Sequence, residues 1–148
     1  MSIAEQVQED MKASMRAGDA EKTRTLRLLK SSMKNEEIKV GHPLSDEEAL
    51  KLLQREAKQR KDSITAYEDA GRTELAATEN SELTVIQGYL PQALGENELK
   101  RIVNEVATEM GATDMKQMGA VIGGVMKRVG AQAEGGTVSK LVRERLSA

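Results

Sequence analysis

The chain has 148 residues, of which 39% are hydrophobic and 31% are charged, and its formal net charge is −2. This balance is typical of a chain that folds as one compact domain or two small ones, and it argues against tight, promiscuous binding of nucleic acid. Cys, Phe and Trp are absent. Disulfides, thiolate nucleophiles and thiolate metal sites are therefore excluded, and the core has to be built from Leu, Ile, Val, Met and Ala.

Apolar residues repeat at intervals of three or four along nearly the whole chain, which predicts an all-α protein. The first such segment runs from Ile3 to Met15 and ends near Gly18. Asp19 is the expected N-cap of the second helix, because its carboxylate can accept hydrogen bonds from the free amides of the first turn. The apolar stripe of this second helix is expected to contain Leu26, Leu29, Met33 and Val40.

Two further helices are predicted before the middle of the chain. The segment Ser45-Asp-Glu-Glu48 matches a capping box, in which the Ser hydroxyl accepts from the N3 amide while the Glu side chain accepts from the N-cap amide. A long third helix should therefore start there and end at Gly71. Thr73 is the expected cap of a fourth helix, with Leu75 on its inner side.

A domain boundary is predicted at Pro91–Gly95, where a helix breaker, a glycine and a new acidic helix start occur together. It separates an N-terminal domain of four helices, 1–91, from a small C-terminal domain of three helices, 92–148. Within the C-terminal domain the first helix should end at Gly111, the next should begin at Thr113, and a short third helix should complete the chain.

Short motifs are spread over the second half of the N-terminal domain and over the C-terminal domain. They are Lys58-Gln-Arg-Lys-Asp-Ser63, Tyr67, Ala70-Gly-Arg72, Glu82-Leu83, Tyr89-Leu-Pro-Gln92, Met118-Gly-Ala-Val-Ile122, Gly130 and Gly135-Gly-Thr-Val138. Together they resemble the YqeY-like family, a helical domain related to the tail of the B subunit of the tRNA-dependent glutamine amidotransferase. The resemblance implies a helical domain followed by a three-helix, tail-like domain. It also implies contact with tRNA and an association with glutamine-dependent carbon–nitrogen ligases.

A self-contained active site is not predicted. The lone His42 lies in a Gly-His-Pro breaker segment, which is typical of a loop. Lys30-Ser31-Ser32 superficially resembles the Ser-Ser-Lys chemistry of amidases, but it lies inside a helical pattern without glycines to expose a nucleophile. No catalytic residue, metal site or cofactor is expected. Whether the chain acts as an enzyme in a larger complex is left open, since the family association concerns the tail and not the catalytic core.

Glu56 and Arg60 lie one turn apart in the apolar stripe of the third predicted helix, so they are a possible buried polar pair. Two interpretations remain open. In the first, an ion pair with further carboxylate partners holds two helices together, since an unpaired buried charge is costly. In the second, Arg60 forms the floor of a pocket for an anion or another ligand.

Candidate nucleic-acid-binding residues lie in the C-terminal domain. On the sixth predicted helix Lys116, Ala120, Gly123 and Lys127 share one side, giving a flat floor with cations about 16 Å apart at its ends. Glycine weakens a helix, so its presence here indicates close approach by another surface, either a helix of the same protein or an RNA backbone or partner. The full candidate set is Lys116, Gly123, Lys127, Arg128, Lys140 and Arg143.

A secondary basic patch is predicted on the second and third helices. Its members are Arg24, Arg27, Lys30, Lys34, Lys51, Arg55 and Lys58. The chain has only two aromatic residues, both Tyr, and so lacks the stacking platforms of single-strand binders. Structured RNA, contacted through its phosphates and shape, is therefore the expected class of nucleic acid.

The leading hypothesis is a noncatalytic helical module that binds tRNA or a tRNA-handling enzyme complex. The alternatives are a protein–protein interaction adaptor without RNA contact, and an accessory subunit of a glutamine-dependent carbon–nitrogen ligase. The N-terminus has no leader pattern and no apolar run reaches the length of a membrane span, so a cytoplasmic protein without membrane contact is expected. Apolar residues on both sides of the second helix fit internal packing or a dimer, and the oligomeric state is left open.

Overall fold

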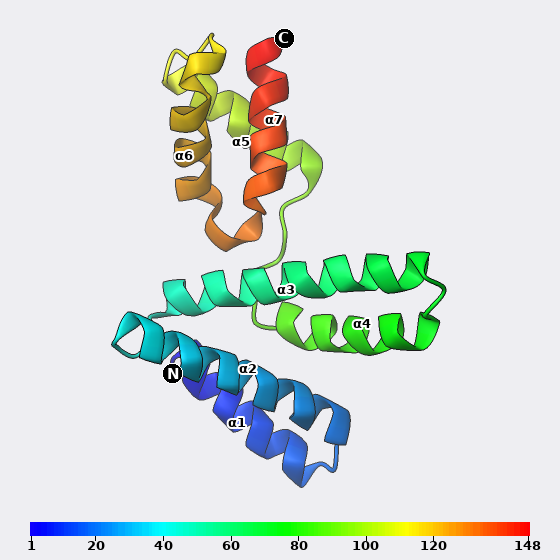
Figure 1. The fold of residues 1–148 in the computed structure, drawn as a ribbon. Coiled ribbons are helices and arrows are strands. Elements are labelled where there is room, and N and C mark those ends of the chain that lie inside the picture. The colour runs from blue at the N-terminus through cyan, green and yellow to red at the C-terminus, as the bar shows by residue number, and fades with distance from the viewer. The chain divides into compact units, whose positions relative to one another are not determined.

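The structure is a computed structural model that describes all residues, 1–148. Its regular elements are seven α-helices and two short 3-10 helices, with no strand, so the prediction of an all-α protein is confirmed (Figure 1). The chain forms two compact units, Met1–Leu90 and Pro91–Ala148. None of the helices combines the length and the apolar content needed to cross a lipid bilayer.

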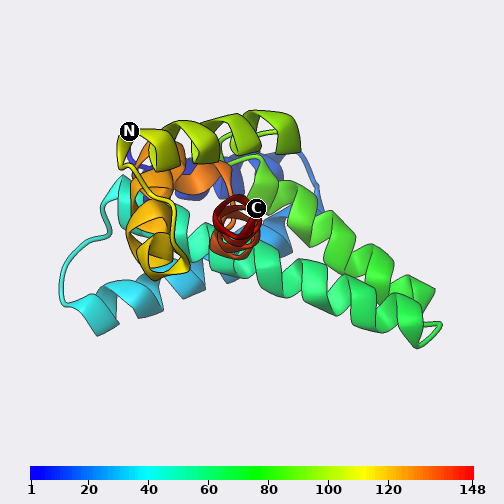
Figure 2. The same cartoon turned by 90° about the horizontal axis from the view of Figure 1, so that it is seen from above.

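The first unit consists of two helical hairpins. Helix α1 (Ile3–Arg16) packs against α2 (Ala20–Val40), as Figure 1 shows. Helix α3 (Asp46–Asp69) packs against α4 (Thr73–Gln87), which is visible in both Figure 1 and Figure 2. Short connections favour such antiparallel neighbours. The hairpins share one apolar core, whose fully buried members include Val7, Leu26, Leu29, Leu53 and Ile86.

The helix ends of this unit follow the local chemistry of the chain. The capping box expected at the start of α3 is confirmed: the Glu48 amide donates to Ser45 Oγ at 3.2 Å, and the Ser45 amide donates to Glu48 Oε1 at 3.1 Å. That backbone bond from Ser45 lowers the pKa of the Glu48 carboxyl. Asp19 caps α2 as expected, and Gly41 ends it in the left-handed conformation, with φ of +82°.

Several expectations for the first unit are wrong. Arg72, and not Thr73, precedes the first turn of α4, and its side chain makes no capping hydrogen bond. Met15, Val40 and Leu75 belong to the apolar stripes read from the sequence, yet all three are exposed. They lie near helix ends, where the apolar stripe continues but no neighbouring helix covers it.

Tyr89 closes the first unit by linking the segment after α4 to α1. Its hydroxyl donates to Asp10 Oδ2 at 2.5 Å. Burial, and then this hydrogen bond to a carboxylate, raise the pKa of Tyr89, because both favour the neutral phenol over the phenolate.

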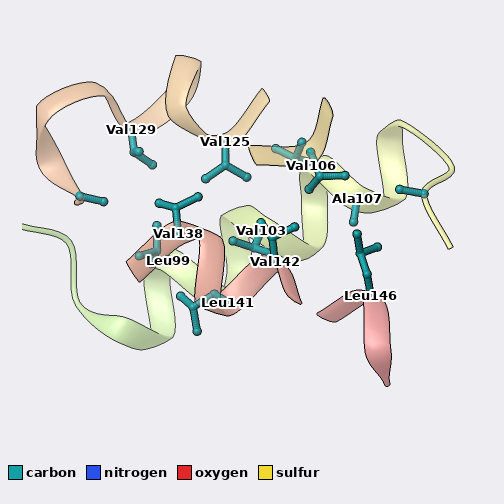
Figure 3. Close-up of a cluster of buried hydrophobic side chains, with 13 residues drawn as sticks. Leu99, Val103, Val106, Ala107, Val125, Val129, Val138, Leu141, Val142 and Leu146 are labelled. Atoms are coloured by element: carbon teal, nitrogen blue, oxygen red, sulfur yellow. The ribbon is translucent and has the colours of Figure 1, made fainter. Parts of the chain in front are cut away.

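The second unit is a three-helix arrangement of α5 (Glu96–Glu109), α6 (Met118–Val129) and α7 (Gly135–Ser147), each packed against the other two. The 3-10 helices η1 (Met115–Gln117) and η2 (Gly130–Gln132) flank α6. Figure 3 shows the core between these elements, which is dominated by short branched side chains. Its fully buried members include Leu99, Val103, Val121, Val125, Val138 and Val142.

The start of the sixth helix differs from the expectation. Asp114, and not Thr113, is the cap: its carboxylate accepts from the Lys116 amide at 3.0 Å and begins η1. Lys116 therefore lies in a 3-10 turn, which has three residues per turn rather than 3.6. Of the predicted row from Lys116 to Lys127, the segment from Ala120 to Lys127 lies on α6, and Lys116 lies on η1 directly before it.

Candidate nucleic-acid interface

The exposed surface of α6 and α7 is the region of the second unit where most of the predicted nucleic-acid-binding residues lie. The two helices pack side by side, with α5 against one side of the pair (Figures 1 and 2). We define the α6–α7 face as the exposed residues Gly119, Gly123 and Lys127 of α6 together with Lys140 and Arg143 of α7. Lys116 is exposed as well, one turn before α6.

The three glycines of α6 have different surroundings. A Cβ atom on Gly124 would lie 2.8 Å from Cγ1 of the buried Val106, so this glycine allows α5 to approach α6 closely. Cβ atoms on Gly119 and Gly123 would meet nothing within 4 Å. The sequence left open whether these glycines face another helix of the protein or an outside surface. Gly124 faces another helix, α5. Gly119 and Gly123 leave the helix backbone open to an outside surface.

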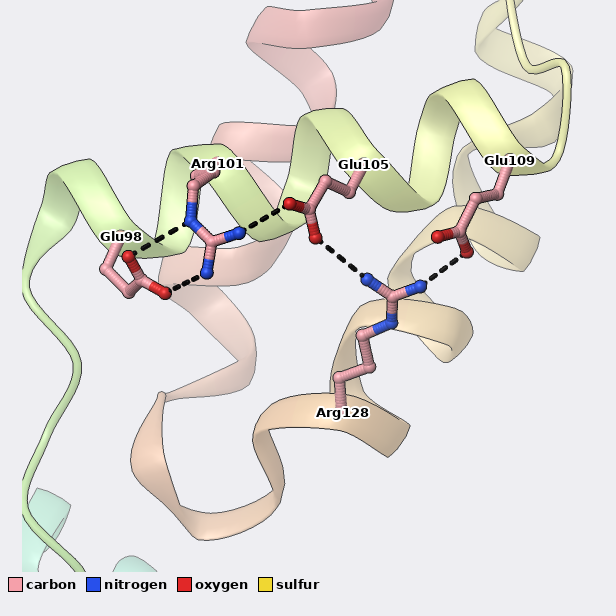
Figure 4. A network of polar contacts seen from close by, with 5 residues as sticks. All are labelled: Glu98, Arg101, Glu105, Glu109 and Arg128. Carbon is pink, nitrogen blue, oxygen red and sulfur yellow. Dashed lines mark hydrogen bonds and ion pairs between the residues drawn. The ribbon is translucent and has the colours of Figure 1, made fainter.

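A network of alternating charges joins α5 to α6 (Figure 4). Arg101 donates to Glu98 and Glu105, and Arg128 donates to Glu105 at 3.1 Å and to Glu109. The bond to Glu98 raises the pKa of Arg101, and the same bond lowers the pKa of Glu98. The bond to Glu109 raises the pKa of Arg128. The carboxylates of this surface of α5 are thus already matched by arginines.

This network separates the cations of the second unit into two groups. Arg128, a predicted nucleic-acid-binding residue, has its guanidinium between two carboxylates of α5. Arg145 donates to Asn104 Oδ1 at 2.8 Å. The remaining candidates have no ion pair and no side-chain hydrogen bond, and they are Lys116, Lys127, Lys140 and Arg143. The sequence did not indicate this division, because the carboxylates that bind Arg128 come from another helix.

The secondary basic patch divides in a similar way. On α3, Lys51 pairs with Glu47 at 3.6 Å, Lys58 pairs with Asp62 at 3.6 Å, and Arg55 pairs with Glu36 of α2 at 3.5 Å. The patch residues of α2 are exposed and make no ion pair; these are Arg24, Arg27, Lys30 and Lys34. Free positive charge in the first unit is therefore concentrated on α2.

Arg60 lies at the centre of a polar cluster between α3 and α4. Its guanidinium contacts Glu56 one turn earlier on α3, and its Nε lies 3.2 Å from Glu82 and 3.9 Å from Glu79, both on α4. The Arg60 side chain is only 13% exposed, so the carboxylates compensate a charge that is largely removed from water. The sequence identified the two residues on α3 but did not identify Glu79 and Glu82, because nothing in the periodicity says which α4 residues face Arg60.

The described residues include no group of three or more His, Asp or Glu side chains that could hold a metal ion. His42 lies in the loop before α3. Its Nδ1 forms a hydrogen bond with the Pro43 carbonyl oxygen at 2.8 Å, and its Nε2 lies 3.6 Å from Glu48 Oε2. Lys30, Ser31 and Ser32 are consecutive residues inside α2, without the exposed, strained turn that a serine nucleophile uses.

Comparisons with known proteins identify relatives that include three proteins named "Altered inheritance of mitochondria protein 41, mitochondrial". The protein from Vanderwaltozyma polyspora is 32% identical over 76% of this chain, and that from Pyrenophora tritici-repentis is 29% identical over 99% of it. The protein from Lachancea thermotolerans is 36% identical over 70% of the chain. The matches span 64%, 82% and 57% of the relatives' own lengths, so this chain covers less than two thirds of two of them.

These names correct the expectation of a cytoplasmic protein, because they describe the relatives as mitochondrial. The expectation rested on the lack of a leader pattern and of an apolar run long enough to span a membrane. Neither observation distinguishes the cytoplasm from the interior of a mitochondrion.

The family model described as "Yqey-like protein" matches residues 4–146. The match extends through both compact units and includes every motif on which the resemblance was based. The chain belongs to the YqeY-like protein family.

Proposed function

We propose that this protein is a noncatalytic helical module that binds structured RNA, with tRNA or a tRNA-handling enzyme complex as its partner. In this proposal the four-helix region (1–91) and the three-helix region (92–148) act as separate domains, and the second resembles the tail of the amidotransferase B subunit. Any role in a glutamine-dependent carbon–nitrogen ligase is that of an accessory subunit, because the chain has no Cys to serve as the glutaminase nucleophile.

The observation that carries the proposal is the unequal matching of charge in the second unit. Glu98, Glu105 and Glu109 of α5 are bound by arginines, whereas the cations of the α6–α7 face have no carboxylate partner. Phosphate groups are the ligands that such free cations favour, and RNA binding through phosphates needs no base-stacking platform.

The open glycines of α6 support the same proposal. A Cβ atom on Gly119 or Gly123 would have no neighbour within 4 Å, so a phosphate backbone can approach the helix backbone between Lys127 and the preceding turns. A larger residue at Gly123 would keep the phosphate backbone away from the helix backbone by the length of its side chain. Shape and charge therefore favour an elongated anionic ligand.

The test is a titration of the protein with folded tRNA at low and moderate salt. The variant Lys127→Glu/Arg143→Glu is expected to bind about tenfold more weakly or worse, and to lower the salt dependence by about two ions released. The control is Lys12→Glu/Lys100→Glu, which makes the same change in net charge at two exposed lysines that already pair with Glu9 and Glu96. Its affinity should match that of the wild type.

Two results would contradict the proposal. One is the absence of tRNA binding by the wild type even at low salt. The other is an equal loss of affinity in both double variants, since that result would reflect the net charge of the protein and not the α6–α7 face.

A further inference from the structure

One side of α2 combines free cations with exposed aliphatic side chains. We define the α2 outer face as Arg24, Arg27, Leu28, Ser31, Lys34 and Ile38. These residues follow one another at spacings of one, three or four, which places them on one side of a helix, opposite the buried Leu26, Leu29 and Met33. The face is about 21 Å long at 1.5 Å per residue.

The positive charge of this face is not compensated within the protein. Arg24, Arg27 and Lys34 make no ion pair. The carboxylates in the second half of α2 are engaged elsewhere: Glu36 pairs with Arg55, and Glu37 accepts from the Leu44 amide at 3.4 Å. The sequence from 22 to 35 contains no acidic residue. A ligand of this face therefore has to bring negative charge.

The apolar members of the face show that it offers more than charge. Leu28 is 45% exposed and Ile38 is 73% exposed, on a helix whose other side is packed into the core. Covering such a side chain stabilises a complex by up to about 1.5–3 kcal/mol. Phosphates would gain nothing from these two residues, whereas a partner with its own apolar side chains would.

We propose that the α2 outer face binds a protein partner that presents an amphipathic helix, with an apolar stripe over Leu28 and Ile38 and carboxylates opposite Arg24, Arg27 and Lys34. This mode matches the recognition of helices through anchors at three- and four-residue spacing. The inference concerns the first unit and does not depend on RNA binding by the second.

The charges of the face argue against the simplest other occupant, a second copy of the same surface. A twofold dimer through this face would place cations against cations, which is unfavourable. A lipid surface also fits poorly. Leu28 and Ile38 are ten residues apart with Ser31 and cations between them, so the face has no continuous apolar stripe to enter a bilayer interface.

A groove beside this face has room for side chains of the partner. It lies between α2 and α3, has a volume of about 310 Å³, and is lined by polar residues that include Ser32, Asn35 and Lys39 of α2 and Arg55 of α3. A helix lying along α2 can place one row of side chains over this groove while its apolar stripe covers the α2 outer face.

The experiment measures binding of the full chain to a fluorescent synthetic helix of about 18 residues, with Leu at three- and four-residue spacing and Glu on both flanks. A scrambled peptide of the same composition is the control for charge alone. We expect the amphipathic peptide to bind and the scrambled one to bind at least about tenfold more weakly. Leu28→Ser/Ile38→Ser and Arg27→Glu/Lys34→Glu should each weaken binding of the amphipathic peptide by about tenfold or more.

Matched variants test whether the effect belongs to this face. Leu75→Ser changes a side chain on α4 that is 44% exposed, and Lys12→Glu reverses an exposed lysine on α1; both should bind the peptide like the wild type. Circular dichroism establishes that each variant keeps its helical content, so that a loss of binding is not a loss of folding.

Four outcomes overturn the inference. The first is equal binding of the two peptides. The second is loss of peptide binding in the control variants. The third is an unchanged affinity in Leu28→Ser/Ile38→Ser. The fourth is preferential use of the face by another ligand: tRNA or phosphatidylserine vesicles that bind the wild type, lose affinity in Arg27→Glu/Lys34→Glu, and compete with the peptide would assign the face to that ligand instead.

Discussion

Each of the two units has arginines that bridge neighbouring helices, but the arginines of one unit are buried and those of the other are exposed. In the first unit Arg60 is largely buried and lies among three carboxylates from α3 and α4. In the second unit Arg101 and Arg128 alternate with three carboxylates on an exposed surface that joins α5 to α6. The same chemical groups therefore occur with and without access to water.

Burial determines what each network contributes. Removing one partner from a buried cluster leaves charges that water cannot solvate, and this is strongly destabilising. The exposed network contributes little to the free energy of unfolding, because water solvates each partner when the pair is broken and salt screens the attraction. The packing of α5 on α6 must then come mainly from apolar contacts, with Gly124 against Val106 as a close one.

The largest effect is expected at the buried cluster. Arg60→Met keeps much of the length of the side chain but removes the guanidinium that Glu56, Glu79 and Glu82 share, and it should lower the free energy of unfolding by about 3 kcal/mol. The measurement is urea unfolding followed by circular dichroism. Arg101→Met is the matched change in the exposed network and should cost much less.

This comparison also separates the two interpretations of Arg60. Loss of stability in Arg60→Met fits an arginine that holds α3 to α4. If the variant kept its stability and instead lost affinity for an anion such as phosphate, Arg60 would belong to a ligand site and the comparison between the two units would no longer hold.

An intermediate effect is expected where α5 meets α6. Gly124→Ala brings a Cβ atom to 2.8 Å from a branched, buried side chain, so an overpacking cost of about 2 kcal/mol should exceed the gain of about 1 kcal/mol in helix propensity. Gly123→Ala, one residue earlier, has open space and should stabilise the helix by up to about 1 kcal/mol. The two substitutions are chemically identical, so opposite signs in thermal unfolding identify the packing contact. A gain in stability for both would show that α5 and α6 are not in close contact at this point.

The sequence was sufficient for the features that depend on neighbouring residues in the chain. The 3.6-residue period predicted the all-α class, and Ser45 with Glu48 predicted the start of α3, because a capping box is formed by residues three positions apart. It was insufficient where two adjacent residues could both serve as a cap. Thr113 and Asp114 are such a pair, and the choice of Asp114 moved Lys116 into a 3-10 turn.

Features that depend on a second helix could not be predicted from periodicity. In the sequence, Arg128 cannot be distinguished from the unpaired cations. In the fold, α5 places Glu105 and Glu109 beside it, although they are 23 and 19 residues away in sequence. In the same way Leu75 has the spacing of a core residue but lies where no helix covers it. The pattern identifies the stripe of a helix, and only the packing decides which positions of the stripe are buried and which charges are matched.

The smallest effect is expected in the exposed network, and its dependence on pH reveals its origin. The hydrogen bond from Arg101 holds the pKa of Glu98 below its ordinary value of 4.5. Because the folded-state pKa is the lower one, this contribution is present above about pH 4.5 and is lost as the pH falls through the folded-state pKa.

Glu98→Gln should therefore be slightly less stable than the wild type at pH 7, and the difference should shrink as the solution is made more acidic. Glu144→Gln on α7, where the carboxylate has no ion pair, is the control for the same loss of one negative charge. A difference for Glu98→Gln that stayed constant with pH, or that resisted molar salt, would mean that the network is shielded from water like the Arg60 cluster.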